Sequence, residues 1–248
     1  MGEMVLQARR VSRHFGGLRA VDEVDLSCNM GEVHAVIGPN GAGKTTLINL
    51  LSGDLRASSG QIVYRGREIT HLPAHRISRL GIGRSYQRTN IFPELTCWQN
   101  CWLAGQSQEQ TSLLFLQPAN ASKRTGGRVE IALKTAGLGA KFDEYANSMS
   151  YGEQRQLEIA MLLAMEPDVL LLDEPLAGMG NDEAAKVVEL IGNLAKDHCI
   201  VLIEHDMDAV FAVADILTVM VDGIILESGP PETIRDSTRV REAYLGDD

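Results

Sequence analysis

The chain alternates short apolar runs with segments of helical periodicity. Its beginning, Met4 to Cys28, alternates apolar and polar residues and predicts antiparallel strands. Two later runs, Val33–Ile37 and Ile200–Ile203, are almost wholly apolar, as is typical of strands buried in a parallel sheet. A third apolar run covers Val169–Leu172, and Asn181–Lys196 has the periodicity of an amphipathic helix. This pattern predicts an α/β fold.

A mostly helical region over residues 89–158 interrupts the α/β pattern. Within it, Thr96 and Gln99 have the spacing of a capping box at the start of a predicted helix. Trp98 and Trp102 follow at i and i+4, where they either plug a small helical lobe or help to build a groove for a partner helix. We therefore predict one domain over 1–248, with a core and β subdomain in 1–88 and 159–248 and a helical subdomain in 89–158.

A glycine-rich segment between the apolar run at Val33–Ile37 and the next helical pattern matches G-x-x-x-x-G-K-[ST]. Backbone N–H groups of such a turn point inward at an anion, and the following helix adds its partial positive charge. The motif predicts that Lys44 reaches the β- and γ-phosphates of a nucleotide and that the Thr45 hydroxyl contacts Mg²⁺. The predicted phosphate loop comprises Gly38, Pro39, Asn40, Gly41, Ala42, Gly43, Lys44, Thr45 and Thr46.

Polar residues follow two of the buried strands. Asp173 and Glu174 come directly after Val169–Leu172, where in a phosphate-loop protein Asp173 would hold Mg²⁺ and Glu174 would polarise the attacking water. His205 follows the strand at Ile200–Ile203, at the carboxyl end of the sheet, where such folds bind ligands. We therefore expect His205 to contact the γ-phosphate.

Three further candidates are ambiguous from spacing alone. Phe15 precedes the phosphate loop and can stack on a nucleotide base, but its pattern favours an ordinary core or hairpin aromatic. Ser150 and Glu153 have capping-box spacing, and the same helix start can also present N–H groups and a hydroxyl to an anion. Gln87 ends a strand predicted over residues 82–87.

Composition narrows the choice of partners. The chain has 248 residues, of which 44% are hydrophobic, and a formal net charge of −10. No basic surplus is available to neutralise phosphates, so we expect no nucleic-acid partner. No apolar run approaches the roughly 20 residues that span a bilayer, and no signal-peptide pattern is visible. These features predict a soluble intracellular protein, unless a partner holds it at a membrane.

Taken together, these segments resemble the ATP-binding subunits of ABC transporters over essentially the whole chain. The order of parts matches: an aromatic before the phosphate loop, Gln87 before a helical insertion, Met149–Glu153 at the L-S-G-G-Q signature, Asp173–Glu174 and His205. The chain is most similar to the branched-chain amino-acid branch, in Phe15–Val21, Tyr151–Arg155, Leu157–Ala160, Glu174–Gly178, Ile203–Met207 and Ala243–Gly246.

The resemblance implies a fold with a P-loop NTPase (RecA-like) core, an N-terminal antiparallel β subdomain and an inserted helical subdomain. It also implies roles for the ambiguous residues. Phe15 becomes the residue that stacks on adenine, and Gln87 contacts Mg²⁺ or water and connects the site to the helical subdomain. Ser150 and Gly152 reach ATP held by the opposite subunit, so that two subunits enclose two nucleotides.

The implied function is ATP hydrolysis, with ATP and Mg²⁺, at the cytoplasmic face of the inner membrane. This hydrolysis would power a membrane transporter that imports branched-chain or other hydrophobic amino acids. The implied partners are transmembrane permease subunits, a second identical or related ATP-binding subunit and, indirectly, a substrate-binding protein. Urea/amide importers, lipopolysaccharide exporters, soluble ABC ATPases and non-hydrolysing regulatory subunits are the alternatives. The chain departs from the broad family at Met149, Tyr151 and Glu153 of the signature and at Gly180, where many relatives have Asp.

Overall fold

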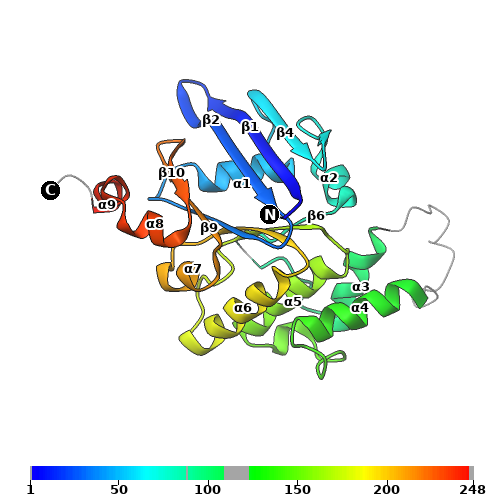
Figure 1. Cartoon of the computed structure of the whole chain (residues 1–248). Helices are drawn as coiled ribbons and strands as arrows, with labels where there is room; N and C mark the ends of the chain where they lie inside the picture. Colours follow the sequence, from blue (N-terminus) through cyan, green and yellow to red (C-terminus); the bar gives the residue numbers. More distant parts are fainter. Residues whose placement is uncertain (1, 88, 109–122, 246–248) are drawn as a thin grey trace.

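The computed structural model describes residues 2–87, 89–108 and 123–245. It contains two β-sheets and a layer of helices (Figure 1). The N-terminal sheet lies at the top of the view, the larger sheet crosses the middle, and helices α3 to α6 lie below it (Figure 1). This arrangement confirms the predicted fold class.

The larger sheet has six strands in the order β10-β9-β3-β8-β7-β6. Strands β9, β3, β8, β7 and β6 run parallel, and β10 pairs antiparallel with β9 across the turn at Asp222 and Gly223. Parallel pairing brings the carboxyl ends of β3, β8 and β7 to one edge. The strands are β3 (Val33–Ile37), β6 (Ile82–Arg84), β7 (Val169–Asp173), β8 (Cys199–Ile203), β9 (Ile216–Val221) and β10 (Ile224–Gly229).

The strand predicted over residues 82–87 is too long. Strand β6 ends at Arg84, although Ser85 still donates a backbone hydrogen bond of 2.9 Å to the carbonyl of Leu171. The main chain of Tyr86 and Gln87 then bonds to side chains of a helix instead of continuing along the strand. The prediction failed because the apolar pattern does not reveal these side-chain partners.

The N-terminal sheet is antiparallel, as predicted, in the order β2-β1-β4-β5. Helix α1 (Lys44–Ser52), which follows the phosphate loop, packs its buried residues between this sheet and the larger one. The strands are β1 (Met4–Phe15), β2 (Leu18–Asn29), β4 (Ser59–Tyr64) and β5 (Arg67–Glu68).

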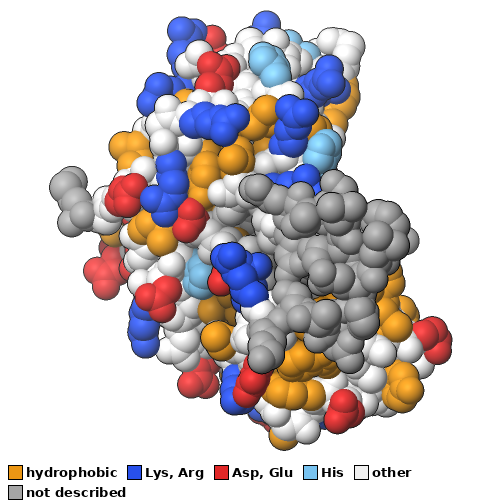
Figure 2. Space-filling model, turned by 90° about the vertical axis from the view of Figure 1, so that its right-hand side faces the viewer, with side chains coloured by type: hydrophobic (Ala, Val, Ile, Leu, Met, Phe, Trp, Pro, Cys, Tyr) orange, Lys and Arg blue, Asp and Glu red, His pale blue; other side chains and the backbone are white. Residues whose placement is uncertain are grey.

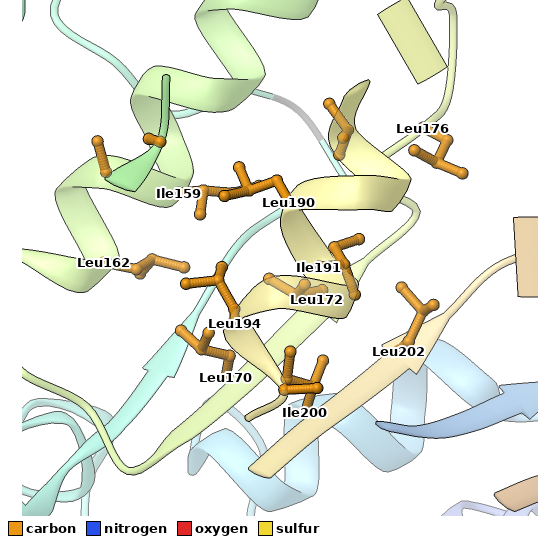
Figure 3. Close-up of a cluster of buried hydrophobic side chains, with 14 of the residues drawn as sticks. Ile159, Leu162, Leu170, Leu172, Leu176, Leu190, Ile191, Leu194, Ile200 and Leu202 are labelled. Atoms are coloured by element: carbon orange, nitrogen blue, oxygen red, sulfur yellow. The ribbon is translucent and has the colours of Figure 1, made fainter. Parts of the chain in front are cut away.

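Successive side chains of the central strands point to opposite faces of the sheet, and this divides the core into two clusters. In β7, Val169 and Leu171 face α1 and the N-terminal sheet, whereas Leu170 and Leu172 face the helical layer. Figure 3 shows the second cluster, in which Leu190 and Leu194 of α6 (Asn181–Leu194) lie among side chains of α5, β7 and β8. The sheet buried on both faces explains why its strands are continuous apolar runs.

The helical region contains α3 (Cys97–Gln106), α4 (Lys123–Thr135) and α5 (Tyr151–Leu163). The capping box at the start of α3 forms as predicted, and Trp98 and Trp102 stack with ring centroids 6.3 Å apart. Helix α5 continues past residue 158 without a break, and the division of the chain into 89–158 and the core stays a prediction. The remaining helices are α2 (Ala74–Leu80), the 3₁₀ turn Ala146–Ser148, α7 (Met207–Val213), α8 (Pro231–Asp236) and α9 (Thr238–Leu245).

Candidate functional site

The glycine-rich loop lies between β3 and the start of α1, as its sequence predicts. Gly43 is the N-cap residue of α1 and has φ +100°. Because it has no side chain, no N-cap side chain accepts a hydrogen bond from the N–H groups of the first helical turn. A β-carbon on Gly43 would lie 2.2 Å from the carbonyl oxygen of Ala20. Only glycine fits this position, and the resulting cradle suits an anion.

Lys44 bends back over the loop. Its Nζ donates hydrogen bonds to the carbonyls of Gly38 at 2.6 Å and Pro39 at 2.9 Å. Burial lowers the pKa of the Lys44 ammonium, while the nearby Glu174 and Asp173 carboxylates act in the opposite direction. A cation held against the glycine-rich loop has the charge that a triphosphate requires.

Glu174 and Gln87 meet beside the loop. Gln87 Nε2 donates a hydrogen bond of 3.0 Å to Glu174 Oε2, although the two residues are 87 positions apart. Glu174 has φ +49°, a conformation unusual for a side-chain-bearing residue, and its N–H donates to the carbonyl of Ile203 at 2.9 Å. Backbone strain of this kind persists where the surrounding structure holds it, often at functional sites.

Asp173 is nearly inaccessible at the end of β7, with a relative exposure of 2%. Burial raises the pKa of its carboxyl, and the Arg84 guanidinium, 3.5 Å from Asp173 Oδ2, opposes this rise. Arg84 also pairs with Asp54 at 2.6 Å, and its side chain is 7% exposed. A carboxylate buried at the end of a strand supplies the kind of oxygen ligand that Mg²⁺ prefers.

A groove of about 690 Å³ joins most of the predicted nucleotide-binding residues. It is lined by Phe15, residues 40–46, Gln87 and Glu174. Its volume lies in the usual range for small-ligand sites. The Phe15 ring is 44% exposed, and the Arg13 guanidinium lies 4.5 Å from its centroid. The Arg13 guanidinium therefore lies over one face of the ring, while the Phe15 side chain still lines the groove.

Six predicted site residues do not line this groove. Gly38 and Pro39 directly precede the loop residues that line it, and Asp173 is buried at the end of β7. The other three are His205, Ser150 and Gly152. His205 follows β8 beside Asp173–Glu174 in the sheet order, but its side chain is exposed and contacts Glu204 instead, with Nδ1 3.7 Å from Oε2. Ser150 and Gly152 line a separate cavity at the start of α5. The single subunit thus brings together Phe15, the phosphate loop, Gln87 and Glu174, and leaves Ser150, Gly152 and His205 apart.

The start of α5 combines two of the predicted features. Ser150 is its N-cap, and Ser150 and Glu153 form the predicted capping box. The Ser150 hydroxyl donates to Glu183 of α6 at 2.8 Å. Gly180, at the position where the family resemblance leads us to expect Asp, is the exposed N-cap of α6 and has no side-chain cap.

Sequence reasoning missed several charged residues that hold the site. Arg155 and Glu158 are buried on α5 and bond to the main chain of Tyr86 and Gln87. Burial raises the pKa of Glu158, and the Arg155 guanidinium opposes this effect. Glu204 accepts a hydrogen bond of 2.8 Å from the N–H of Leu176 and so fixes the loop after Glu174. The sequence offers no distinct signal for these residues, because α5 carries several other polar side chains and Glu204 lies after the end of β8.

Three further features of the described residues are their surface charge, the length of their helices and the state of the cysteines. Figure 2 shows acidic and basic side chains interspersed over one face, with Lys and Arg more frequent towards the N-terminal sheet at the top. Within the described ranges, no helix is both long enough and apolar enough to cross a membrane. All four cysteines are buried and free.

The chain matches known proteins over its whole length. A family model described as ABC transporter matches residues 21–177, and one described as branched-chain amino acid ATP-binding cassette transporter matches residues 225–248. The high-affinity branched-chain amino acid transport ATP-binding protein LivG of Salmonella typhimurium is 38% identical and covers 100% of both chains. BraF of Pseudomonas aeruginosa, described in the same words, is also 38% identical with 100% of both chains covered.

Solved structures agree with the sequence matches. A nucleotide-free ATP-binding cassette from an ABC transporter superposes with a TM-score of 0.87 at 28% identity, covering 98% of this chain and 100% of that one. The ADP conformation of an ATP-binding cassette gives the same TM-score and identity, covering 98% and 99% of the two chains. The predicted family resemblance is therefore confirmed.

Proposed function

The chain belongs to the ABC transporter family as an ATP-binding and ATP-hydrolysing subunit, and from this premise we propose that it powers the import of branched-chain or other hydrophobic amino acids. The names of the LivG and BraF relatives and the match of residues 225–248 to the branched-chain family model support the choice of cargo. ATP is the substrate, and Mg²⁺ is the proposed metal.

One observation carries the assignment of the hydrolytic site: the 3.0 Å contact between Gln87 and Glu174 at the edge of the groove that the phosphate loop lines. In the proposed reaction, Glu174 orients and polarises the water that attacks the γ-phosphate. Lys44 and the loop N–H groups stabilise the charge that develops on the phosphoryl oxygens. Phe15 stacks on adenine with the face of its ring that Arg13 leaves free.

The residues at the metal position have suitable chemistry. Asp173, the Thr45 hydroxyl and Gln87 would hold Mg²⁺ with oxygen ligands. When bound, Mg²⁺ neutralises charge on the β- and γ-phosphates. His205 completes the proposed catalytic set as a contact to the γ-phosphate, which requires its exposed side chain to turn towards the groove from the end of β8.

Ser150 and Gly152 do not reach the nucleotide site of their own subunit, because they line a different cavity from the phosphate loop. This separation supports a dimer in which they complete the site of a second ATP-binding subunit. ATP-binding subunits of this family work with permease subunits and dimerise. We further propose that the α3 region with Trp98 and Trp102 faces the permease, with the chain held at the cytoplasmic face of the inner membrane and a substrate-binding protein acting indirectly.

Release of inorganic phosphate tests the ATPase directly. The purified chain should release phosphate from ATP in the presence of Mg²⁺ and not in its absence, as followed with malachite green. Lys44→Ala should abolish release, whereas Lys134→Ala, on the exposed side of α4 in an ion pair with Glu130, should not. ATP binding without phosphate release would favour the regulatory-subunit alternative.

Cargo and partners require the complete transporter. Membrane proteins that co-purify with the tagged chain should be reconstituted in liposomes, and ATP-driven uptake of leucine should be compared with uptake of urea. Accumulation of leucine is the expected result. Uptake of urea alone, or co-purification of an exporter, would overturn the proposed cargo.

A further inference from the structure

A buried ion pair on α5 lies directly against the segment that carries Gln87. Arg155 Nη1 and Glu158 Oε2 are 2.8 Å apart at i and i+3 of the helix. Their side chains are 1% and 6% exposed. Burial of an ion pair is weak evidence for a role in stability, because apolar residues of similar volume are often at least as stable. The contacts of this pair indicate what else it does.

Both residues bond to the main chain of Tyr86 and Gln87. Arg155 donates to the carbonyl of Tyr86 at 2.8 Å and to that of Gln87 at 2.5 Å. Glu158 Oε1 accepts from the N–H of Tyr86 at 3.3 Å and from that of Asn90 at 3.4 Å. The guanidinium fork and the carboxylate thus replace the strand partners that the segment lacks after β6 ends at Arg84.

The same helix begins at the segment expected to meet the second subunit. Ser150 is the N-cap of α5, and its capping box closes the first turn. Arg155 Nη2 also donates to the Tyr151 hydroxyl at 3.2 Å, within that turn. Because Ser150 and Arg155 belong to one short and capped helical segment, a displacement of the helix start is transmitted to the guanidinium.

We propose that Arg155 and Glu158 are positioning residues that couple the Ser150–Gly152 segment to Gln87, and through Gln87 to Glu174 of the same subunit. Contact of Ser150 and Gly152 with the partner's nucleotide then sets where the Gln87 amide meets Glu174. The inference rests on the proposed roles of Gln87 and Glu174. It assigns to Arg155 and Glu158 no contact with ATP.

A double-mutant cycle on ATP hydrolysis tests the coupling. The variants are Arg155→Lys, Gln87→Ala and the two combined, measured as kcat and KM for ATP. Lysine keeps the charge opposite Glu158 but has no fork to bond two carbonyls. We expect Arg155→Lys to lower kcat by about tenfold with KM within about twofold, since small misplacement near the reacting groups is costly. In the Gln87→Ala background the same change should lower kcat by less than about twofold.

Two further variants guard against a general loss of folding. Arg128→Lys is the matched control, because Arg128 is another largely buried arginine in an ion pair, with Glu166, and it is not in the groove. It should leave kcat unchanged. Glu158→Gln keeps the shape and one acceptor oxygen, and its effect on kcat should also disappear in the Gln87→Ala background. Thermal unfolding establishes that each variant is folded.

The possible outcomes distinguish a failure of the proposed coupling from a failure of the proposed role of Gln87. Suppose that Gln87→Ala lowers kcat and that Arg155→Lys still lowers kcat by its full factor in the Gln87→Ala background. The coupling is then overturned, and the role of Gln87 stands. An Arg155→Lys variant with unchanged kcat has the same meaning. If Gln87→Ala itself hydrolyses ATP at the normal rate, the proposed role of Gln87 fails and the coupling fails with it.

Discussion

The Ser150 hydroxyl donates a hydrogen bond of 2.8 Å to a carboxylate oxygen of Glu183, the third residue of α6. A β-carbon placed on Gly152 would lie 2.8 Å from the carboxyl carbon of the same Glu183. One carboxylate therefore covers both residues that are proposed to contact the partner's ATP. A triphosphate and a carboxylate are both acceptors and both negative, so they compete for this position.

Removal of the Glu183 carboxylate should strengthen the ATP-dependent dimer. In a Glu174→Gln background, Glu183→Ala should lower the dimer dissociation constant by about tenfold, as expected when one hydrogen bond to a charged group no longer has to be broken. Analytical ultracentrifugation with saturating ATP measures it. Asp182→Ala is the matched control, because Asp182 is an exposed acidic neighbour in the same helical turn. Weaker association of Glu183→Ala would mean that the carboxylate supports the dimer.

Glu174→Gln should retain ATP binding, abolish turnover and trap a dimer. The amide keeps an oxygen for the bond from Gln87 but cannot accept a proton from water, and loss of a general base costs at least about 100-fold in rate. Phosphate release and gel filtration with ATP measure the two effects. Hydrolysis at a normal rate would remove Glu174 from its proposed role.

Phe15→Ala should weaken ATP binding through loss of stacking, by roughly 5- to 100-fold. The same variant should bind inorganic triphosphate as well as the original chain does, because the phosphate loop is untouched. Phe92→Ala is the control, since Phe92 is a similarly exposed phenylalanine that does not line the groove. Equal loss for ATP and triphosphate would show that Phe15 supports the loop and not the base.

Glu153→Gln tests whether Glu153, which departs from the family signature, stabilises the folded protein through its charge. A hydrogen bond from Lys141 lowers the pKa of Glu153, with the two groups 2.8 Å apart. A carboxyl with a lowered pKa in the folded state stabilises the protein above its unfolded pKa, about 4.3, and this contribution disappears as pH falls through the folded value.

The Glu153→Gln variant should therefore be less stable by about 0.5 kcal/mol near neutral pH, the size expected for a partly exposed ion pair. The difference from the original chain should vanish in acid. Thermal unfolding at both pH values measures it. Because glutamine can also form the capping box, a difference that stays constant with pH would contradict the electrostatic explanation.

Local chemistry explains which parts of the site were predictable from the sequence. The phosphate loop and the two capping boxes use residues a few positions apart, so spacing specifies them. Asp173 ends a buried strand and Glu174 follows it, and parallel pairing necessarily takes such strand ends to one edge of a sheet. Recognition of the family added Phe15 and Gln87, both of which line the groove.

Contacts between distant residues were decided only by the tertiary structure. The bond from Gln87 to Glu174 depends on β6 lying beside β7 in one register, and the bonds from Arg155 to the Gln87 segment depend on how α5 packs beneath them. The covering of Ser150 by Glu183 likewise requires α6 to begin beside α5. The sequence by itself determined the loop, the strands and the helix starts, because their interactions are local. Strand order, register and helix packing decided which charged side chains meet, because those pairs are separated by tens of residues along the chain.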